Sequence, residues 1–207
     1  EGVLTAGTLQ VLAIFDKTDP LDGPFFEETI YVTPTALDAA SQRHLAATIQ
    51  QASDAIGLRH GPIHAECRIG PRGIVVLEVA ARPIGGLCSR VLRFSDGSSL
   101  ERVLLRHARG EDVSTVIREA AAAAVMMIPI PRRGLLKSVA GQAAARAVRH
   151  VEDIQVTAKR GQLLEPLPEA GSYLGFIFAR ASSTAEADAA VRAAHARLSF
   201  TIDPAIE

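Results

Sequence analysis

The sequence predicts an α+β fold built on antiparallel strands, and three observations support this class. An alternating run at 63–69 and an apolar run at 74–81 both have the pattern of β-strands. The residues between them, Gly70-Pro71-Arg72-Gly73, have the composition of a turn, so the two runs are predicted to form a hairpin. The other strands and amphipathic helices lack the regular alternation of a doubly wound parallel sheet.

The segment before the hairpin is predicted to contain two strands and one helix. The strands lie at 9–15 and 28–33, and a loop rich in Asp, Pro and Gly lies between them at 18–24. The helix opens at Thr33-Pro34-Thr35, continues to about Ile56 on a helical spacing of apolar residues, and terminates at Gly57.

The segment after the hairpin divides near Pro129 and Pro131, so we expect a core domain at 1–130 and a small α+β domain at 131–207. In the core domain, Asp96-Gly97-Ser98 is expected to cap a second helix at 100–109. Ala-rich stretches are expected to form helices. The small domain is predicted to contain, in order, a strand at 134–139, a helix at 142–148, strands at 151–157 and 172–179, a helix at 184–197 capped by Ser183 or Thr184, and a strand at 198–202.

Composition narrows the classes of function. The 22 basic and 23 acidic residues nearly balance and Trp is absent, so neither nucleic acid nor an anionic membrane is an expected partner. The longest apolar run, 120–130, is too short to span a bilayer, and no export signal is recognised. Cys67 and Cys88 are expected to be reduced thiols in a cytoplasmic protein. The first residue is Glu1 rather than Met, which predicts a fragment or a processed chain.

The hairpin brings two glutamates together. If its loop has three residues and ends with Gly73 in the left-handed region, Gly70 pairs with Ile74 and Glu66 falls directly opposite Glu78. Because side chains alternate along a strand, both carboxylates then lie on the same face of the sheet.

This pair of glutamates is the candidate metal site. Like charges opposite each other destabilise a sheet, and a bound divalent cation would offset them. Proteins usually hold Mg²⁺ with one or two carboxylates, and substrate phosphates complete its shell. The alternative is that Glu66 and Glu78 are solvated, or paired with Arg68 and Arg82.

Neighbouring residues are candidates for contacts with a substrate or a nucleotide. Arg82 can neutralise a phosphate or an anionic intermediate. Gly85-Gly86 allows a substrate to approach backbone N–H groups. His64 shares a face with Glu66 and is a candidate base or polar contact, although a lone His in a strand is more often structural.

Three further candidates lie before the hairpin. Glu28 can bind an ammonium group, Tyr31 follows it by three residues, and Lys17 can approach an anion. The alternatives are a solvated strand end for Glu28 and an exposed charge for Lys17. The other histidines have no ligand-like spacing, so no zinc site is expected.

These residues resemble the ATP-grasp superfamily and, within it, the carboxylate–amine ligases similar to bacterial L-amino acid ligases. The block 61–94 carries the resemblance. Glu66 and Glu78 stand where the family binds Mg²⁺, Arg82 where it has its catalytic arginine, and Gly85-Gly86 where a turn lines its substrate.

The block 28–34 is similar to the family segment that meets the amino substrate, so the resemblance assigns Glu28 and Tyr31 to substrate binding. Lys17 and His64 are assigned to the nucleotide side of the site. Two positions depart from the family pattern. Ala80 stands where many members have an Asn as a third metal ligand, and Tyr31 stands where related ligases often have a His.

The resemblance implies a ligase that uses ATP with Mg²⁺, or with Mn²⁺ in its place. It would join a small-molecule carboxylate and an amine, for which amino acids are the expected substrates, through an acyl phosphate and with release of ADP. The phosphate-binding subdomain would precede Glu1, so the N-terminal half of the same protein is an expected partner. The sequence leaves open whether the protein forms a homodimer. Two alternatives also stay open: a non-catalytic or degenerate ATP-grasp binding or dimerisation module, and a biotin carboxylase-like ATP-grasp carboxylase.

Overall fold

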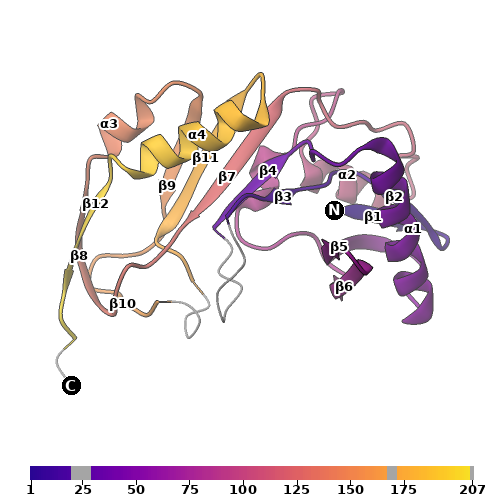
Figure 1. Cartoon of the computed structure of the whole chain (residues 1–207), viewed down its shortest axis with the longest axis horizontal. Helices are drawn as coiled ribbons and strands as arrows, with labels where there is room; N and C mark the ends of the chain where they lie inside the picture. The colour runs from indigo at the N-terminus through magenta and orange to yellow at the C-terminus, as the bar shows by residue number, and fades with distance from the viewer. Residues whose placement is uncertain (20–28, 167–171, 206–207) are drawn as a thin grey trace. The chain divides into compact units, whose positions relative to one another are not determined.

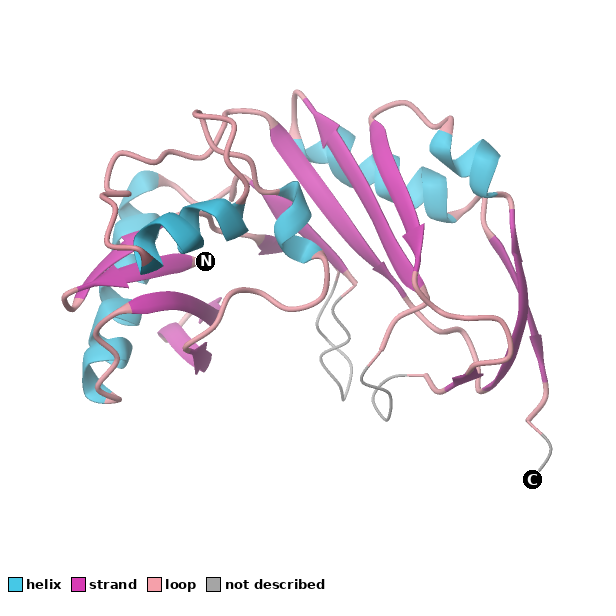
Figure 2. Cartoon of the chain, turned by 180° about the vertical axis from the view of Figure 1, so that it is seen from behind, coloured by secondary structure: helices cyan, strands magenta, loops and turns pink. Residues whose placement is uncertain are grey.

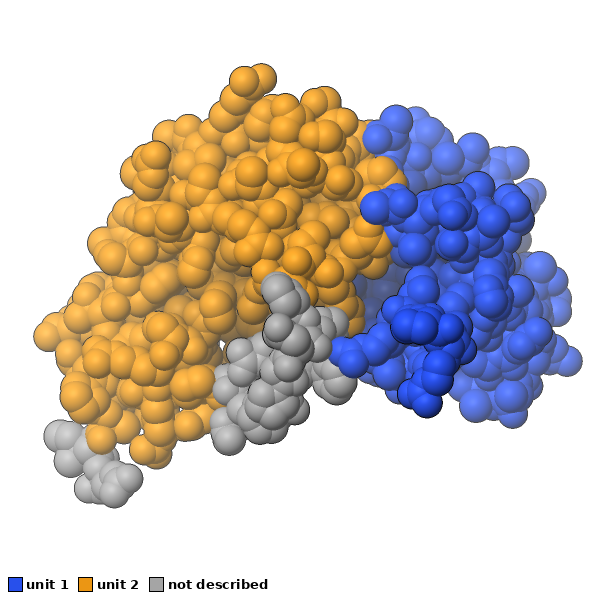
Figure 3. Space-filling view, in the orientation of Figure 1, with its two compact units in different colours: residues 1–14, 35–120 blue, residues 15–34, 121–207 orange. Residues whose placement is uncertain are grey.

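A computed structural model describes residues 1–19, 29–166 and 172–205 (Figure 1). The chain forms two compact units, which Figure 3 distinguishes by colour: unit 1 comprises residues 1–14 and 35–120, and unit 2 comprises residues 15–34 and 121–207. This division differs from the expected boundary after residue 130. Residues 15–34 belong with the second half of the chain because β4 (Ile30–Thr33) pairs with β7 (Ala122–Ile128).

Unit 1 is a four-stranded antiparallel sheet with helices on both faces. Its strand order is β2-β1-β5-β6. The elements of unit 1 are β1 (Gly2–Thr5), β2 (Thr8–Val11), α1 (Ala39–Ala55), β5 (Gly61–Gly70), β6 (Gly73–Ala80), the 3-10 helix η1 (Cys88–Val91) and α2 (Leu100–Ala108).

Helix α1 covers one face of this sheet, which we call the inner face. The opposite face is the outer face. Ile49 of α1 packs with Leu4 of β1 and Ile63 of β5, and Val76 and Val79 of β6 extend this cluster. These apolar side chains exclude water, which stabilises the helix on the sheet.

The caps of α1 and α2 differ from those expected. Helix α1 begins at Ala39, later than predicted, because the Asp38 side chain accepts a hydrogen bond from the Ser41 backbone N at 2.8 Å. Helix α2 begins at Leu100 as predicted, but its N-cap is Ser99. Asp96 instead accepts from the Ser98 backbone N at 2.9 Å and so stabilises the preceding turn.

Helix α2 is joined to the outer face of the sheet through His107. The His107 Nε2 and the Thr5 Oγ1 are hydrogen-bonded at 2.9 Å, and the His107 ring stacks on His60 with 4.3 Å between ring centroids. Burial, together with the neighbouring His60, lowers the pKa of His107.

Unit 2 contains two antiparallel sheets around a larger apolar core. A five-stranded sheet has the order β3-β4-β7-β11-β9, and a three-stranded sheet has the order β10-β8-β12. Figure 1 and Figure 2 show α3 and α4 on the same face of the five-stranded sheet. The remaining elements of unit 2 are β3 (Asp16–Lys17), β8 (Gly134–Ala140), α3 (Gln142–Arg146), β9 (Val151–Val156), β10 (Leu163–Leu164), β11 (Gly175–Ala181), α4 (Thr184–His195) and β12 (Ser199–Asp203).

The antiparallel α+β class is confirmed, and the elements predicted for 134–202 agree with the structure to within three residues at each end. The prediction for the Ala-rich stretch 120–124 was wrong, because most of it begins the central strand β7, in which every residue is buried. Strand β1 was not predicted. Within the described residues, no helix has the length and hydropathy that a membrane span requires.

Candidate active site

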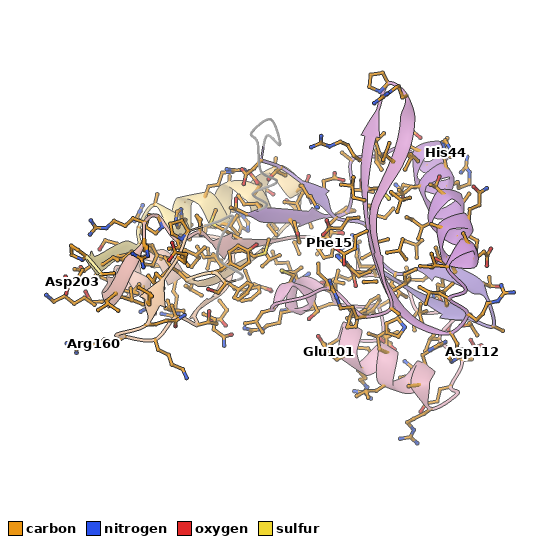
Figure 4. All side chains as sticks on the ribbon, turned by 90° about the horizontal axis from the view of Figure 1, so that it is seen from below. Phe15, His44, Glu101, Asp112, Arg160 and Asp203 are labelled. Atoms are coloured by element: carbon orange, nitrogen blue, oxygen red, sulfur yellow. The ribbon has the colours of Figure 1, made fainter. Side chains whose placement is uncertain are left out.

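The hairpin β5–β6 places Glu66 directly opposite Glu78, as predicted, although the loop length and the strand pairing near the tip differ from those predicted. The loop has two residues, since Gly70 pairs with Gly73 rather than with Ile74. A β-bulge nearer the site restores the predicted register, because one strand there contains an extra residue. Figure 4 shows this hairpin as the long two-stranded ribbon beside α1.

The extra residue is Leu77. Cys67 pairs with Val76 while Glu66 pairs with Glu78, so Leu77 has no partner in the register and its side chain is half exposed. Strict alternation from Val76, which faces the core, would direct Glu78 inward as well. The bulge shifts the alternation by one residue. As a result, Val79 packs against the core and Glu78 remains outside.

Each of the two carboxylates has a cationic partner. Glu78 Oε1 accepts a hydrogen bond from Arg82 Nη2 at 3.0 Å, and both side chains are about half exposed, at 46% and 50%. Glu66 Oε1 lies 3.3 Å from His64 Nε2. The alternative pairing of Glu78 with Arg82 therefore occurs in the structure, and both partners offset part of the repulsion between the carboxylates.

His64 is held from its other side by Glu1. The His64 Nδ1 is hydrogen-bonded to Oε1 of Glu1, whose side chain is only 2% exposed, and Glu1 Oε2 accepts from the Ile84 backbone N at 2.9 Å. Burial acts to lower the pKa of His64, but the hydrogen bonds to Glu1 and Glu66 outweigh it and raise the pKa to about 9. Burial acts to raise the pKa of Glu1, and the bond to His64 contributes to a net lowering.

Sequence reasoning did not identify Glu1 as part of this arrangement. It lies just before β1, a strand of four residues, and neither the residue nor the strand has a local signature. Only the pairing of β1 with β5 brings Glu1 near His64, and this pairing joins segments about 60 residues apart.

The carboxylate pair fits a magnesium ion held partly by substrate. No group of three or more His, Cys, Asp or Glu side chains in the described ranges is arranged to hold a metal. A metal at Glu66 and Glu78 would have two carboxylate ligands from the described residues, and phosphate and water oxygens would complete an octahedral shell. Ala80 adds no ligand, in agreement with this count. Oxygen ligands of this kind suit Mg²⁺ and Mn²⁺ alike.

The turn Gly85-Gly86 follows Arg82 and is exposed. Gly86 has φ of 60°, in the left-handed region that glycine adopts without strain. A Cβ added at Gly85 would meet no atom within 4 Å, so the backbone there faces open space. Ile84, by contrast, is buried and anchors the turn to unit 1.

The structure brings together six of the predicted site residues in unit 1, and two others belong to unit 2. The six in unit 1 are His64, Glu66, Glu78, Arg82, Gly85 and Gly86. Lys17 and Tyr31 lie in unit 2, opposite each other on β3 and β4, with the Lys17 Nζ 5.6 Å from the centroid of the Tyr31 ring. Tyr31 is buried and lies beside Phe15. Glu28 lies outside the described residues.

Family models and a relative match parts of this chain. The model of the ATP-grasp domain matches residues 1–91, and the model of the L-amino acid ligase C-terminal domain 2 matches residues 126–203. The uncharacterized protein y4rH of Sinorhizobium fredii is 25% identical over 174 residues, which are 83% of this chain and 36% of that protein.

Solved structures show the same fold. The L-amino acid ligase from Bacillus licheniformis matches with a TM-score of 0.82 and 26% identity, over 98% of this chain and 50% of that one. The phosphoribosylglycinamide synthetase from Anaerococcus prevotii matches with a TM-score of 0.77 and 10% identity, over 98% of this chain and 52% of that one. The chain thus spans about half the length of these solved structures.

The two matched models cover most of both units, and the ATP-grasp match includes the hairpin with its facing glutamates. Together these matches support a place for the chain in the ATP-grasp superfamily, within its group of carboxylate–amine ligases.

Proposed function

We propose that the full-length protein containing this chain is an ATP- and Mg²⁺-dependent ligase that joins an amino acid carboxylate to an amine. A carboxylate oxygen would attack the γ-phosphorus of ATP, forming an acyl phosphate and releasing ADP. The amine nitrogen would then attack the acyl carbon, with loss of a proton and departure of inorganic phosphate, to form an amide.

The facing pair Glu66 and Glu78 carries this proposal. Their shared outer face supports joint binding of Mg²⁺, which would neutralise phosphate charge during transfer. Arg82 lies beside Glu78 and supports a role in stabilising the acyl phosphate and the tetrahedral intermediate. The exposed N–H groups at Gly85-Gly86 would line the substrate.

Amino acids are the proposed substrates because the family model at residues 126–203 and one matched structure both belong to L-amino acid ligases. Glu28 would orient the amino substrate, with Tyr31 nearby in sequence, and Lys17 would serve the nucleotide. Since the chain spans half the length of the matched ligase, we expect the rest of the nucleotide site to come from other parts of the same protein. The isolated chain should therefore show no turnover.

Replacing Glu78 in the full-length protein tests the proposal. Glu78→Ala should reduce Mg²⁺-dependent ADP release in the presence of amino acid pairs by at least about 100-fold, because one of the two proposed metal ligands is lost. Glu165→Gln, which changes a partly exposed carboxylate of unit 2 paired with Arg133, should retain activity and serves as the control. Turnover close to that of the unsubstituted protein in Glu78→Ala would reject the metal role.

Ala80 favours a second candidate, a module that binds nucleotide without turnover, because the described residues offer only two protein ligands for the metal. Calorimetric titration of the full-length protein with ATP and Mg²⁺, combined with an assay of ADP release, separates the two functions. The second candidate predicts binding without ADP release for every amino acid pair offered.

A further inference from the structure

A continuous chain of hydrogen bonds runs from the glycine turn to one of the metal carboxylates. The Ile84 backbone N donates to Glu1 at 2.9 Å, Glu1 is hydrogen-bonded to His64 Nδ1, and His64 Nε2 lies 3.3 Å from Glu66 Oε1. The four groups come from the residue before β1, from β5 and from the segment after β6, so tertiary structure brings them together.

The members of this chain differ in burial in a consistent order. The exposed fraction of the side chain rises from 2% at Glu1 to 10% at His64 and 21% at Glu66. Glu1 is thus too buried to reach a nucleotide or metal, and both of its oxygens are already used. A buried carboxylate of this kind is costly unless it is paired and hydrogen-bonded, as Glu1 is to His64 and Ile84.

Fixing both ring nitrogens of His64 restricts its rotation. Glu1 holds Nδ1, so Nε2 is directed at Glu66 and sets the position of that carboxylate. Groups that orient metal ligands in this way commonly change metal affinity by 10- to 100-fold when removed. Glu78 differs, because its partner Arg82 is half exposed.

We propose that Glu1 and His64 are positioning residues that hold the Glu66 carboxylate in its metal-binding orientation and tie it to the Gly85-Gly86 turn through Ile84. His64 therefore acts through Glu66 rather than by touching the nucleotide. This inference rests on the proposed function, since it assumes that Glu66 is a metal ligand.

Binding of Mn²⁺ to the full-length protein, measured by electron paramagnetic resonance in the presence of a non-hydrolysable ATP analogue, tests the inference. Glu1→Gln and His64→Gln should each raise the Kd for Mn²⁺ about 10-fold. The double variant should be no weaker than the worse single variant, because the two residues act in series. His44→Gln, on the exposed side of α1 (Figure 4), is the matched control and should bind as the unsubstituted protein does.

A kinetic measurement separates positioning from general damage. In both single variants, the Mg²⁺ concentration for half-maximal ADP release should rise by the same factor. The rate at saturating Mg²⁺ should stay within about 3-fold of the unsubstituted protein, since Glu66 itself is retained.

Several outcomes would overturn the inference. Unchanged Mn²⁺ affinity in both variants, additive losses in the double variant, or unfolding of both single variants would each show that the network serves stability alone. If the unsubstituted protein binds Mn²⁺ and only Glu66→Gln weakens binding, the inference fails while the proposed function stands. If the unsubstituted protein binds no Mn²⁺ with the nucleotide, both fail together.

Discussion

The two units of this chain handle polar side chains in opposite ways. In unit 2, the central strand β7 is buried along its whole length, and α4 contributes small apolar residues to the same core. In unit 1, the sheet buries His64 with charged partners and presents two carboxylates on its outer face. Of the buried polar or charged side chains in the described residues, Thr33 belongs to unit 2, and Ser53, His64, Ser98 and His107 belong to unit 1.

This contrast indicates that the core of unit 2 mainly stabilises the fold, whereas the hairpin of unit 1 holds the candidate site. An apolar core gains stability from buried area, whereas a site must keep charged groups near its surface and tolerate their repulsion. Substitutions in unit 2 should therefore change stability, and substitutions at the hairpin of unit 1 should change activity. Each of the following expectations tests that separation.

The largest effect is expected for a cavity in unit 2. Ile177 is fully buried in β11, between β7 and β9. Ile177→Ala should lower the free energy of unfolding by about 2–5 kcal/mol, measured by urea denaturation. Ile117→Ala in unit 1 removes the same atoms from a side chain that is 68% exposed, and should change stability by less than about 0.5 kcal/mol. Equal losses from both variants would contradict the contrast.

Two arginines provide the next comparison. Arg82→Ala should reduce ADP release by about 100- to 1,000-fold, because a donor to developing negative charge is lost, with a stability change below about 1 kcal/mol for so exposed an ion pair. Arg180→Ala in unit 2 should leave turnover unchanged. It should cost about 1–3 kcal/mol of stability, because Arg180 is largely buried and is 3.0 Å from Glu152. Turnover and urea denaturation of both variants provide the comparison, and a reversed pattern would refute it.

Alkaline pH should weaken unit 1. The pKa of His64 is about 9 in the folded state and 6.5 when unperturbed, so its stabilisation is complete below pH 6.5 and is lost as the pH rises through 9. The difference corresponds to on the order of 3 kcal/mol. Hydrogen exchange of β5, corrected for the intrinsic rate, should therefore accelerate between pH 7 and pH 9.5. His64→Gln should remove this extra acceleration, and its persistence would assign it to another group.

The smallest effects are expected at two matched helix caps. Ser99 caps α2 in unit 1 and Ser183 caps α4 in unit 2, each accepting a backbone hydrogen bond at 3.3 Å. Ser99→Ala and Ser183→Ala should each lower stability by about 1 kcal/mol in thermal denaturation and leave ADP release unchanged. A loss of turnover in Ser99→Ala would show that α2 contributes to the site.

Local sequence patterns predicted most of the elements and the pairing of the two glutamates. The alternation at 63–69 and the turn residues predicted a hairpin with Glu66 opposite Glu78, and the structure confirms this pairing. The bulge was hidden, because Leu77 is one apolar residue among several and has no glycine to mark it. The error in the loop length and the missing bulge cancelled at the glutamates.

Features that depend on distant segments could not be predicted in the same way. Glu1 joins the site only through the pairing of β1 with β5, and residues 15–34 join unit 2 only through the pairing of β4 with β7. The Ala-rich start of β7 favours helix by intrinsic propensity, and burial between two strands overrides that preference.

The extra residue in β6 divides the hairpin into two parts with different registers. Between Leu77 and the tip, the two-residue loop sets the register. On the other side of Leu77, the register is shifted by one residue, and this shift places Glu66 opposite Glu78. A residue inserted or deleted at the tip would therefore shift the pairing only as far as the bulge, which would leave Glu66 opposite Glu78.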